Sequence, residues 1–408
     1  MALKLFTIRR KTTNTSGGKN LLHKKQSRGD VTFAIVILGL SIWGILMVYS
    51  GSVLVAIKDE QVPYYFAAKQ ALWVILGLIS AFVVYTIDYH IIAKFAKLML
   101  GISLIFMVIV LFFNANDAFK RWISLGGFNF QPVELTKFTF FLYISTWLAK
   151  VKDSPKINNT WLAFKHHFKR DLLPFLLLLG GVCLLIIAQP DMDTALLLGV
   201  TSFIVYFISG NDFIHLMGSI STGLVLIIIG FFTTLAANYR MSRISNFIQF
   251  WQTGNIPNRF GSGYQLMQII VAVASGGLFG VGFGESRQKF YYLGDTAFTD
   301  TMFAIIAEEF GVAGAIVVVA LFFFILLRGF KIAREAPDKL GSLIVISMVI
   351  WITLQAFLHI ATNVGLIPIN GNTLPFLSYG GSSTLMSLTA MGLVMNVSRS
   401  ALKQQNIR

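Results

Sequence analysis

The sequence predicts an all-α polytopic integral membrane protein, and its composition, its apolar runs and the placement of its basic residues all indicate this class. The 408 residues are 55% hydrophobic and 12% charged, with a mean hydropathy of +0.71. Soluble domains carry about 25% charged residues. A chain with so few polar side chains cannot cover the surface of a water-soluble protein of this size. Lipid must therefore surround most of the chain. A soluble enzyme is therefore excluded.

Ten apolar runs approach the roughly 20 residues that a helix needs to cross a bilayer. They cover residues 32–56, 66–87, 91–113, 132–149, 172–188, 194–209, 213–235, 302–327, 340–362 and 376–397. Only the short segment Gln189–Asp193 separates the fifth run from the sixth, so a merger of these two, or a re-entrant hairpin, is the main alternative. We expect about ten transmembrane helices, and an even number places both termini on one side of the membrane.

The basic residues support this count, because Lys and Arg near the ends of membrane helices remain cytoplasmic. With the N-terminus inside, twenty-three of the 33 Lys and Arg residues lie inside and eight lie outside. Residues 1–30 hold eight basic residues and predict a disordered cytoplasmic tail, held near anionic headgroups. A single membrane domain over 31–399 and a cytoplasmic C-terminal tail over 400–408 complete the predicted organisation.

The longest segment between apolar runs, residues 236–301, is predicted to be a large extracytoplasmic loop between helices 7 and 8. Loops of this length are usually functional or disordered. This loop is rich in aromatic residues and includes the apolar, Gly-rich stretch Ala272–Gly284, which favours a functional loop. The Gly-rich stretch matches no phosphate-binding pattern and is typical of tight breaks between helices.

Ionisable residues inside the apolar runs are candidate functional residues, because each costs about 3 kcal/mol to insert. Lys69 opens the second run, Glu134 and Lys137 lie in the fourth, and Glu308 and Glu309 lie near the start of the eighth. The spacing of Glu134 and Lys137 places both on one helix face, where they can pair. Such a pair could bind a ligand or only fix helix packing, and the glutamate doublet could likewise only hold the long loop in place.

Cations gather on the predicted outer face, where the topology rule expects few. They are Lys120, Arg121, Arg240, Arg243, Arg259, Arg287 and Lys289. Guanidinium groups match phosphate oxygens in bidentate fashion, so the cluster indicates an anionic ligand. A solvated loop surface is the alternative for any single member.

Asp295 and Asp300 lie just before the eighth apolar run. An aspartate at this position could cap the helix. It could instead act as a general base whose pKa is raised by desolvation at the membrane surface. The residue pattern leaves both interpretations open. The six histidines show no spacing typical of metal ligands, so no metal site is predicted.

Several segments together resemble the SEDS (shape, elongation, division, sporulation) family of cell-wall proteins. They are Met47–Ser50, Arg121–Ile123, Gln131–Lys137, Gln189–Asp191, Tyr239–Arg240 with Arg243, Gly261–Gln265 with Gln268, Thr299–Asp300, Ala307–Glu309, Asn363–Leu366 and Pro375–Ser383. Each motif is weak alone, but their order and spacing are specific. Gln265 and the segment Glu285–Lys289 resemble the FtsW branch most closely, with the RodA branch next.

Three positions depart from the family pattern. Val133 replaces a usual small residue, and Asp193 stands where the Gln-Pro-Asp motif usually continues with Gly. The segment Gly294–Phe298 replaces the usual Pro-Glu-x-His sequence before the family's essential aspartate. The last departure makes Asp295 a fallback for the catalytic acid.

The resemblance implies a peptidoglycan glycosyltransferase that polymerises lipid II at the outer face of the bacterial cytoplasmic membrane. Asp300 matches the essential aspartate and is expected to be the general base. Basic groups would stabilise the undecaprenyl pyrophosphate leaving group, with a divalent cation (Mg²⁺ or Mn²⁺) as an expected helper and no organic cofactor. The expected substrate-binding residues are Lys69, Arg121, Glu134, Lys137, Arg243, Gln268, Lys289, Glu308 and Ser378.

The resemblance also implies a class B penicillin-binding protein as the partner transpeptidase, together with other division proteins. The expected location is the division septum, with both termini cytoplasmic. Two alternatives belong to other classes. One is a lipid II flippase, for which Lys69, Glu134 and Lys137 would form a polar track, and the other is a non-catalytic divisome scaffold.

Overall fold

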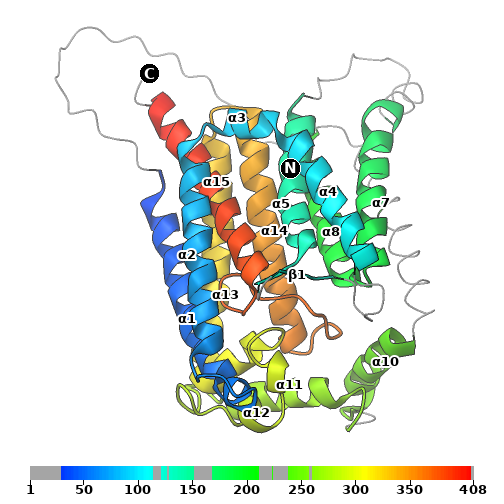
Figure 1. The fold of residues 1–408 in the computed structure, drawn as a ribbon, viewed down its shortest axis with the longest axis vertical. Helices are drawn as coiled ribbons and strands as arrows, with labels where there is room; N and C mark the ends of the chain where they lie inside the picture. Colours follow the sequence, from blue (N-terminus) through cyan, green and yellow to red (C-terminus); the bar gives the residue numbers. More distant parts are fainter. Residues whose placement is uncertain are drawn as a thin grey trace, which may run out of the picture.

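The computed structural model describes residues 29–113, 121–125, 128–150, 168–210, 223, 238–256 and 260–405. These residues form a bundle of long helices with shorter helices across its two ends (Figure 1). The long helices are α1 (Val31–Lys58), α2 (Tyr65–Thr86), α4 (Ala96–Phe113), α5 (Pro132–Lys150), α7 (Leu173–Ala188), α8 (Met192–Ser209), α13 (Met302–Glu335), α14 (Lys339–Asn363) and α15 (Gly381–Gln405). The shorter ones are α3 (Tyr89–Lys94), α10 (Asn238–Thr253), α11 (Tyr264–Ser275) and α12 (Arg287–Tyr291).

Six helices are long and apolar enough to cross a membrane: α1, α2, α7 with the π-helical turn before it, α8, α13 and α14. The predicted polytopic membrane class is thereby confirmed. The fifth and sixth apolar runs form separate helices, α7 and α8, joined at Gln189–Asp191. The predicted seventh helix, 213–235, lies outside the described residues apart from Gly223, so the count of ten stays a prediction.

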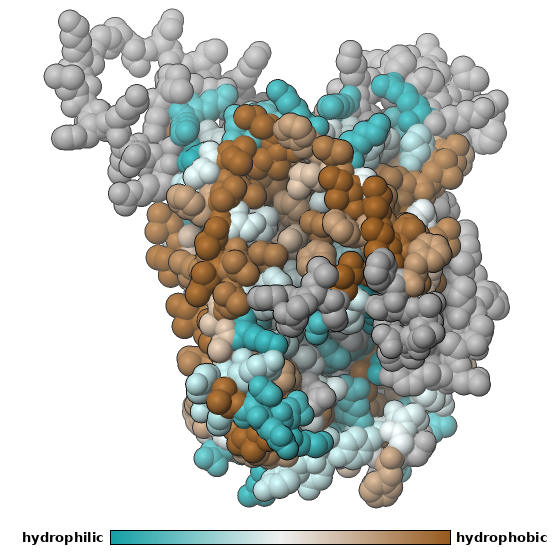
Figure 2. Space-filling model, in the orientation of Figure 1, coloured by the Kyte–Doolittle hydropathy of each residue, from teal (hydrophilic) through white to brown (hydrophobic). Residues whose placement is uncertain are grey.

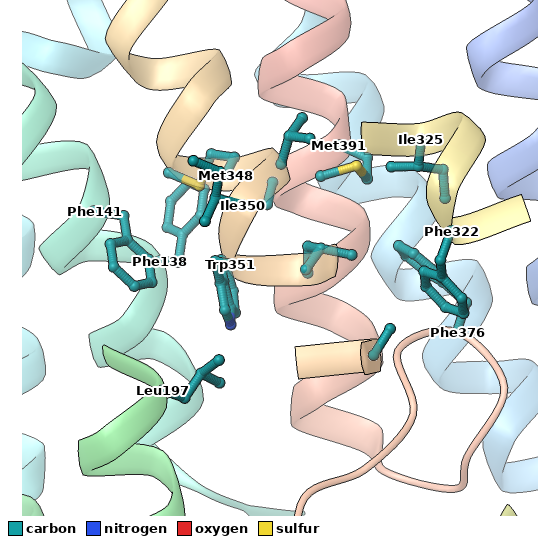
Figure 3. Packing of buried hydrophobic residues seen from close by; sticks show 14 of the residues in the cluster. Phe138, Phe141, Leu197, Phe322, Ile325, Met348, Ile350, Trp351, Phe376 and Met391 are labelled. Atoms are coloured by element: carbon teal, nitrogen blue, oxygen red, sulfur yellow. The ribbon is translucent and has the colours of Figure 1, made fainter. Parts of the chain in front are cut away.

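Helix α14 is the centre of the bundle, since 83% of its apolar window is buried, against 22–44% for the other five candidate spans. Trp351 of α14 packs on Phe141 of α5 with ring centroids 5.7 Å apart. Phe322 of α13 and Met391 of α15 complete this part of the core (Figure 3). The surrounding helices turn hydrophobic residues outward over the side of the bundle (Figure 2), as expected where lipid is the solvent.

The two ends of the bundle differ. We call the end that carries α10–α12, the α7–α8 turn and residues 364–380 the loop end, and the opposite end the terminal end. At the terminal end, Gly29 lies beside Met395 and Arg399 of α15, so the N-terminal end of α1 and the C-terminal half of α15 meet there. Asp30 caps α1 through Phe33 N and pairs with Arg328 of α13 at 2.5 Å.

Two helices depart from their predicted spans for local reasons. The third apolar run breaks at Phe95 into α3, which lies across the terminal end (Figure 1), and α4. Helix α13 runs on to Glu335 but kinks at Gly311, where φ is +67°. A side chain there would clash, since a Cβ would lie 2.4 Å from Gly280 N. The Gly-rich stretch packs its backbone on this kink, with Val312 N donating to Gly277 O at 2.9 Å.

The last helix begins at Gly381, not at residue 376 as predicted, because the preceding segment is held in an irregular turn. Phe376 has a φ of +67°, and buried Gln70 of α2 donates to Ser378 O at 3.3 Å and to Thr384 Oγ1 at 3.0 Å. Helix α15 then continues through Gln405, so the predicted C-terminal tail begins as helix. Among the described residues, one antiparallel hairpin, β1 (Ile123–Leu125) and β2 (Phe128–Phe130), adds to the helical fold.

Candidate functional site

The backbone of Asp300 is fixed at the loop end by the last turn of α14. Asn363 Nδ2 donates to Asp300 O at 3.1 Å, and Ala304 N donates to Asn363 Oδ1 at 3.3 Å. Thr301 Oγ1 also donates to Thr296 O at 2.9 Å. Helix α13 begins at Met302 with Thr301 as its N-cap and no side-chain cap bond. The N-cap of α13 is thus Thr301, and Asp300 lies one residue before it.

Charged groups from three other segments surround this carboxyl group. They are Arg121 before β1, Asp193 in the first turn of α8, and Arg243 in α10. Burial raises the pKa of Asp300 to about 6; Arg243 and Arg121 oppose the rise, and the negative charge of Asp193 adds to it. A carboxyl group with this pKa is ionised at neutral pH but is a stronger base than an ordinary aspartate.

Main-chain carbonyl groups hold both arginines in place. Arg121 Nε donates to Gln189 O at 3.0 Å, and its Nη2 donates to Pro190 O. Arg243 Nη1 donates to Ile369 O at 3.4 Å. These bonds orient the two guanidinium groups near the acid, because a guanidinium presents its N–H donors in a fixed fork.

Two apolar grooves are lined in part by residues of the loop end. One, of about 410 Å³, lies between α10 and α11 and reaches Val364. The other, of about 470 Å³, lies among α11, α13 and α14. Both are lined by Val273 and Val364, and Val364 follows the Asn363 that holds Asp300. An apolar chain and a charged headgroup could thus lie side by side at this end of the bundle.

The predicted pair in the fourth span is present but lies in the helix interface. Lys137 Nζ donates to Glu134 Oε1 at 2.9 Å and to Gln355 Oε1 of α14 at 3.0 Å. Lys137 is 1% exposed and Glu134 is 5% exposed. Gln355 Nε2 in turn donates to Thr373 O at 3.0 Å. This geometry matches the packing interpretation of the pair and gives no support to an open polar track.

The glutamate doublet and Lys289 form a second buried network, which holds α12 against α13. Lys289 Nζ donates to Glu309 Oε1 and, at 2.6 Å, to Ser50 Oγ of α1. Glu308 accepts hydrogen bonds from Ser286 Oγ at 2.5 Å and Arg287 N at 3.0 Å. The positive charge of Lys289 is thus paired with a carboxylate within the fold. Glu308 and Glu309 hold the long loop in place, which is one of the two interpretations given above.

The remaining predicted binding residues lie on separate elements. Lys69 Nζ of α2 donates to Tyr65 Oη at 2.6 Å. Ser378 Oγ accepts from Leu374 N at 3.0 Å and so closes its own turn. Gln268 is half-buried on α11. The side chains of Asp295 and Arg240, together with residues 120 and 259, lie outside what the structure describes.

The described part of the chain contains no preformed metal site. No three His, Cys, Asp or Glu side chains converge there as a cation cage would require. The two carboxyl groups at the site, Asp193 and Asp300, face guanidinium groups instead. The expected divalent cation stays a prediction, and no chemical step is derived through it.

The sequence did not mark three residues that build the site. Asp193 appeared only as a departure from a motif, although its Oδ2 accepts from Gly371 N at 3.1 Å within the charged cluster. Asn363 lies in a recognised motif but had no assigned role. Gly371 had no signal in the sequence. In the structure it lies beside the acid, because a Cβ placed on it would lie 3.9 Å from Asp300 Oδ2.

Taken together, the fold and the site define an integral membrane protein with a half-buried acid near two guanidinium groups at one end of its helix bundle. The chain belongs to the family of cell cycle proteins that comprises FtsW, RodA and SpoVE, whose family model matches residues 30–403.

Individual relatives cover nearly the whole chain. It is 35% identical over 381 residues to stage V sporulation protein E of Bacillus subtilis (strain 168), covering 92% of this chain and 98% of that protein. It is also 35% identical over 400 residues to a probable peptidoglycan glycosyltransferase FtsW of Thioalkalivibrio sulfidiphilus (strain HL-EbGR7), covering 96% and 94% of the two chains.

Solved structures share the fold. A chain described under "Structural coordination of polymerization and crosslinking by a peptidoglycan synthase complex" superposes with a TM-score of 0.70 at 25% identity, covering 91% of this chain and 98% of the other. The rod shape determining protein RodA of Thermus thermophilus superposes with a TM-score of 0.62 at 22% identity, covering 91% and 97%.

Proposed function

We propose that this protein is a peptidoglycan glycosyltransferase that polymerises lipid II into glycan strands at the outer face of the bacterial cytoplasmic membrane during cell division. Membership in the FtsW, RodA and SpoVE family supports the reaction class. The observation that carries the assignment of the site is Asp300, desolvated and flanked by Arg243 and Arg121. The loop end, where these residues lie, is then extracytoplasmic, and both termini are cytoplasmic.

In the proposed reaction, the C4 hydroxyl of the acceptor sugar attacks C1 of the donor sugar. Asp300 accepts the hydroxyl proton as the new C4–O–C1 bond forms. The bond between C1 and the phosphate oxygen breaks, its electron pair leaves with the undecaprenyl pyrophosphate, and C1 is inverted. Arg243 and Arg121 are fixed where negative charge grows on the leaving group, which lowers the barrier because they need no reorganisation.

The other predicted cations contribute differently. Lys289 and Lys137 are each compensated by a carboxylate, and Lys69 bonds a tyrosine hydroxyl. We propose that Lys289 and Lys137 hold the helices in place, and that Arg243 and Arg121 stabilise the leaving group. The apolar grooves beside Val364 would accommodate isoprenoid chain.

The partner is proposed to be a class B penicillin-binding protein that crosslinks the new strands, alongside other division proteins at the septum. The matched chain of a peptidoglycan synthase complex supports a partnership of this kind. Polymerisation should therefore be assayed with and without that transpeptidase.

Asp300→Asn tests the proposal in detergent, where no leaflets exist. The isosteric amide cannot accept the proton, so the rate of glycan formation from lipid II should fall about 10²- to 10⁴-fold with an unchanged melting temperature. Asp59→Asn removes the same charge from an exposed position between α1 and α2 and should keep the wild-type rate. If Asp300→Asn polymerised lipid II at the wild-type rate, the assignment of Asp300 as the base would be wrong. If the purified wild-type protein formed no glycan strands in detergent, a flippase or a scaffold would account for the protein better.

A further inference from the structure

Asp193 places a second carboxyl group beside the proposed base. It lies in the first turn of α8, two residues after Asp191, which caps that helix through Thr194 N at 3.3 Å. Asp193 is half-buried, and its Oδ2 accepts a hydrogen bond from Gly371 N at 3.1 Å. The same glycine faces Asp300, because a Cβ on Gly371 would lie 3.9 Å from Asp300 Oδ2. The two carboxyl groups thus flank one residue.

The contact of Asp193 with Gly371 joins two segments far apart in the sequence. It fixes the segment 364–380 to the start of α8, and Arg243 reaches the same segment at Ile369 O. Asp193 therefore has two effects that must be separated, a hydrogen bond that holds a loop and a negative charge near the reacting acid.

We propose that Asp193 is a positioning residue for glycosyl transfer, whose negative charge lies beside Asp300 and balances the two arginines before the reaction. This inference rests on the proposed function. Asp193 stands where the family motif Gln-Pro-Asp-x-Gly usually has Gly, so the proposed role belongs to this chain.

Charge balance gives the physical reason. The charged groups that face Asp300 are Arg243 from α10, Arg121 from the segment before β1 and Asp193 from α8, while Asp191 acts on Asp193 from the same helix. Two carboxylates and two guanidinium groups cancel before the reaction. When Asp300 takes the proton, a net positive charge appears as the leaving pyrophosphate becomes negative. Electrostatic stabilisation is then greater in the transition state than in the ground state, which is what accelerates a reaction.

Without Asp193 the site would carry excess positive charge from the start. It would bind the pyrophosphate of the substrate more tightly, while Asp300 would lose basicity. A nearby like charge disfavours ionisation of a carboxyl group, and its removal lowers the pKa. An enzyme without the Asp193 charge should therefore have a lower kcat and an unchanged or lower KM. The acidic limb of its pH–rate profile should move to lower pH.

Two substitutions separate the charge from the hydrogen bond. Asp193→Asn keeps an oxygen that can accept from Gly371 N but has no charge, whereas Asp193→Gly removes both. The purified full chain, with its transpeptidase partner, is assayed for initial rates of lipid II polymerisation over about pH 4.5 to 8. Asp59→Asn is the matched control, and the melting temperature of each variant is measured in the same detergent.

Both Asp193 variants should shift the midpoint of the acidic limb of the pH–rate profile down by about one pH unit, a shift that corresponds to about 1.4 kcal/mol of repulsion between the two carboxylates. Asp59→Asn should match wild type. An Asp193→Asn profile that superimposes on wild type would overturn the inference, and a defect confined to Asp193→Gly would then assign Asp193 to the loop contact alone. Failure of the proposed function looks different, because the wild-type protein would then form no glycan strands, or Asp300→Asn would keep wild-type activity, and either result would overturn both.

Discussion

Breaking the buried ion pair between Lys289 and Glu309 should release the short helix α12 from the bundle. The two side chains are 3% and 1% exposed, and Glu309→Gln would leave the ammonium group of Lys289 buried with Ser50 as its neutral partner. Removing one member of a buried pair costs about 3 to 5 kcal/mol. The whole stability of a protein is about 5 to 15 kcal/mol. A helix of five residues has little stability of its own, so α12 should open before the bundle unfolds.

Limited proteolysis combined with thermal melting in detergent distinguishes these events. Glu309→Gln should accelerate cleavage within 276–293 at temperatures where the long helices remain intact. The double variant Lys289→Met with Glu309→Leu should recover most of the lost stability, because replacing both charges leaves neither one unpaired. Lys331 and Glu335 form an exposed pair at 4.0 Å and supply the control. Glu335→Gln should change stability by less than about 0.5 kcal/mol.

A Glu309→Gln variant that melts and is cleaved like wild type would refute this role of the ion pair. The same holds if the double variant is less stable than either single variant, since the charges would then contribute more as a pair than their desolvation costs.

Three further predictions follow from single residues. Asp300 acts as a base with a pKa of about 6, so the polymerisation rate should fall below pH 6 and reach about a tenth of its plateau at pH 5. Gly44→Ala should reduce the yield of folded protein, because the new Cβ would lie 2.0 Å from Phe376 O, whereas Gly39→Ala in the same helix meets nothing within 4 Å and should be neutral. His90 bonds Asp88 at 2.8 Å and Asp338 at 2.7 Å. Burial lowers its pKa, but the two carboxylates outweigh this effect and raise it. The bridge should thus stabilise the protein below the unfolded pKa and weaken as pH rises through the folded one, and melting of His90→Gln should lack this pH dependence.

Hydropathy was sufficient to find the six helices that are long and apolar enough to cross a membrane, because lipid imposes a minimum length on any helix that crosses it. The separation of α7 from α8 also followed from the polar segment Gln189–Asp193. The break at Phe95 and the late start of α15 could not be predicted in this way. They depend on contacts made by other elements, such as the hydrogen bonds of Gln70 to the Ser378–Thr384 segment, and no local sequence pattern encodes them.

The site was predicted in part for a similar reason. Arg121 and Arg243 were recognisable because cations on the predicted outer face require an explanation, and Asp300 was recognisable by its match to the family's essential aspartate. Whether two charges neutralise each other depends on distance in space, and Lys289 gave no sign in the sequence that it pairs with Glu309. Asp193 was visible as an unusual residue, but its place beside Gly371 required the packing of α8 against the segment 364–380.

The charged side chains inside this protein form two groups. The first group consists of the buried pairs Lys137–Glu134 and Lys289–Glu309. It supports the second group, the charged cluster of Asp300, Asp193, Arg121 and Arg243. Lys137 and Lys289 each pair with one carboxylate, and both pairs fix segments that carry the site. Lys137 acts through Gln355 on Thr373, two residues after Gly371. Lys289 holds the beginning of α13 through Glu309, shortly after Asp300. A substitution in either pair would displace the acid and its arginines without touching substrate. Loss of activity alone therefore does not make these lysines ligands, whereas a changed pH profile with intact folding would identify a residue of the charged cluster.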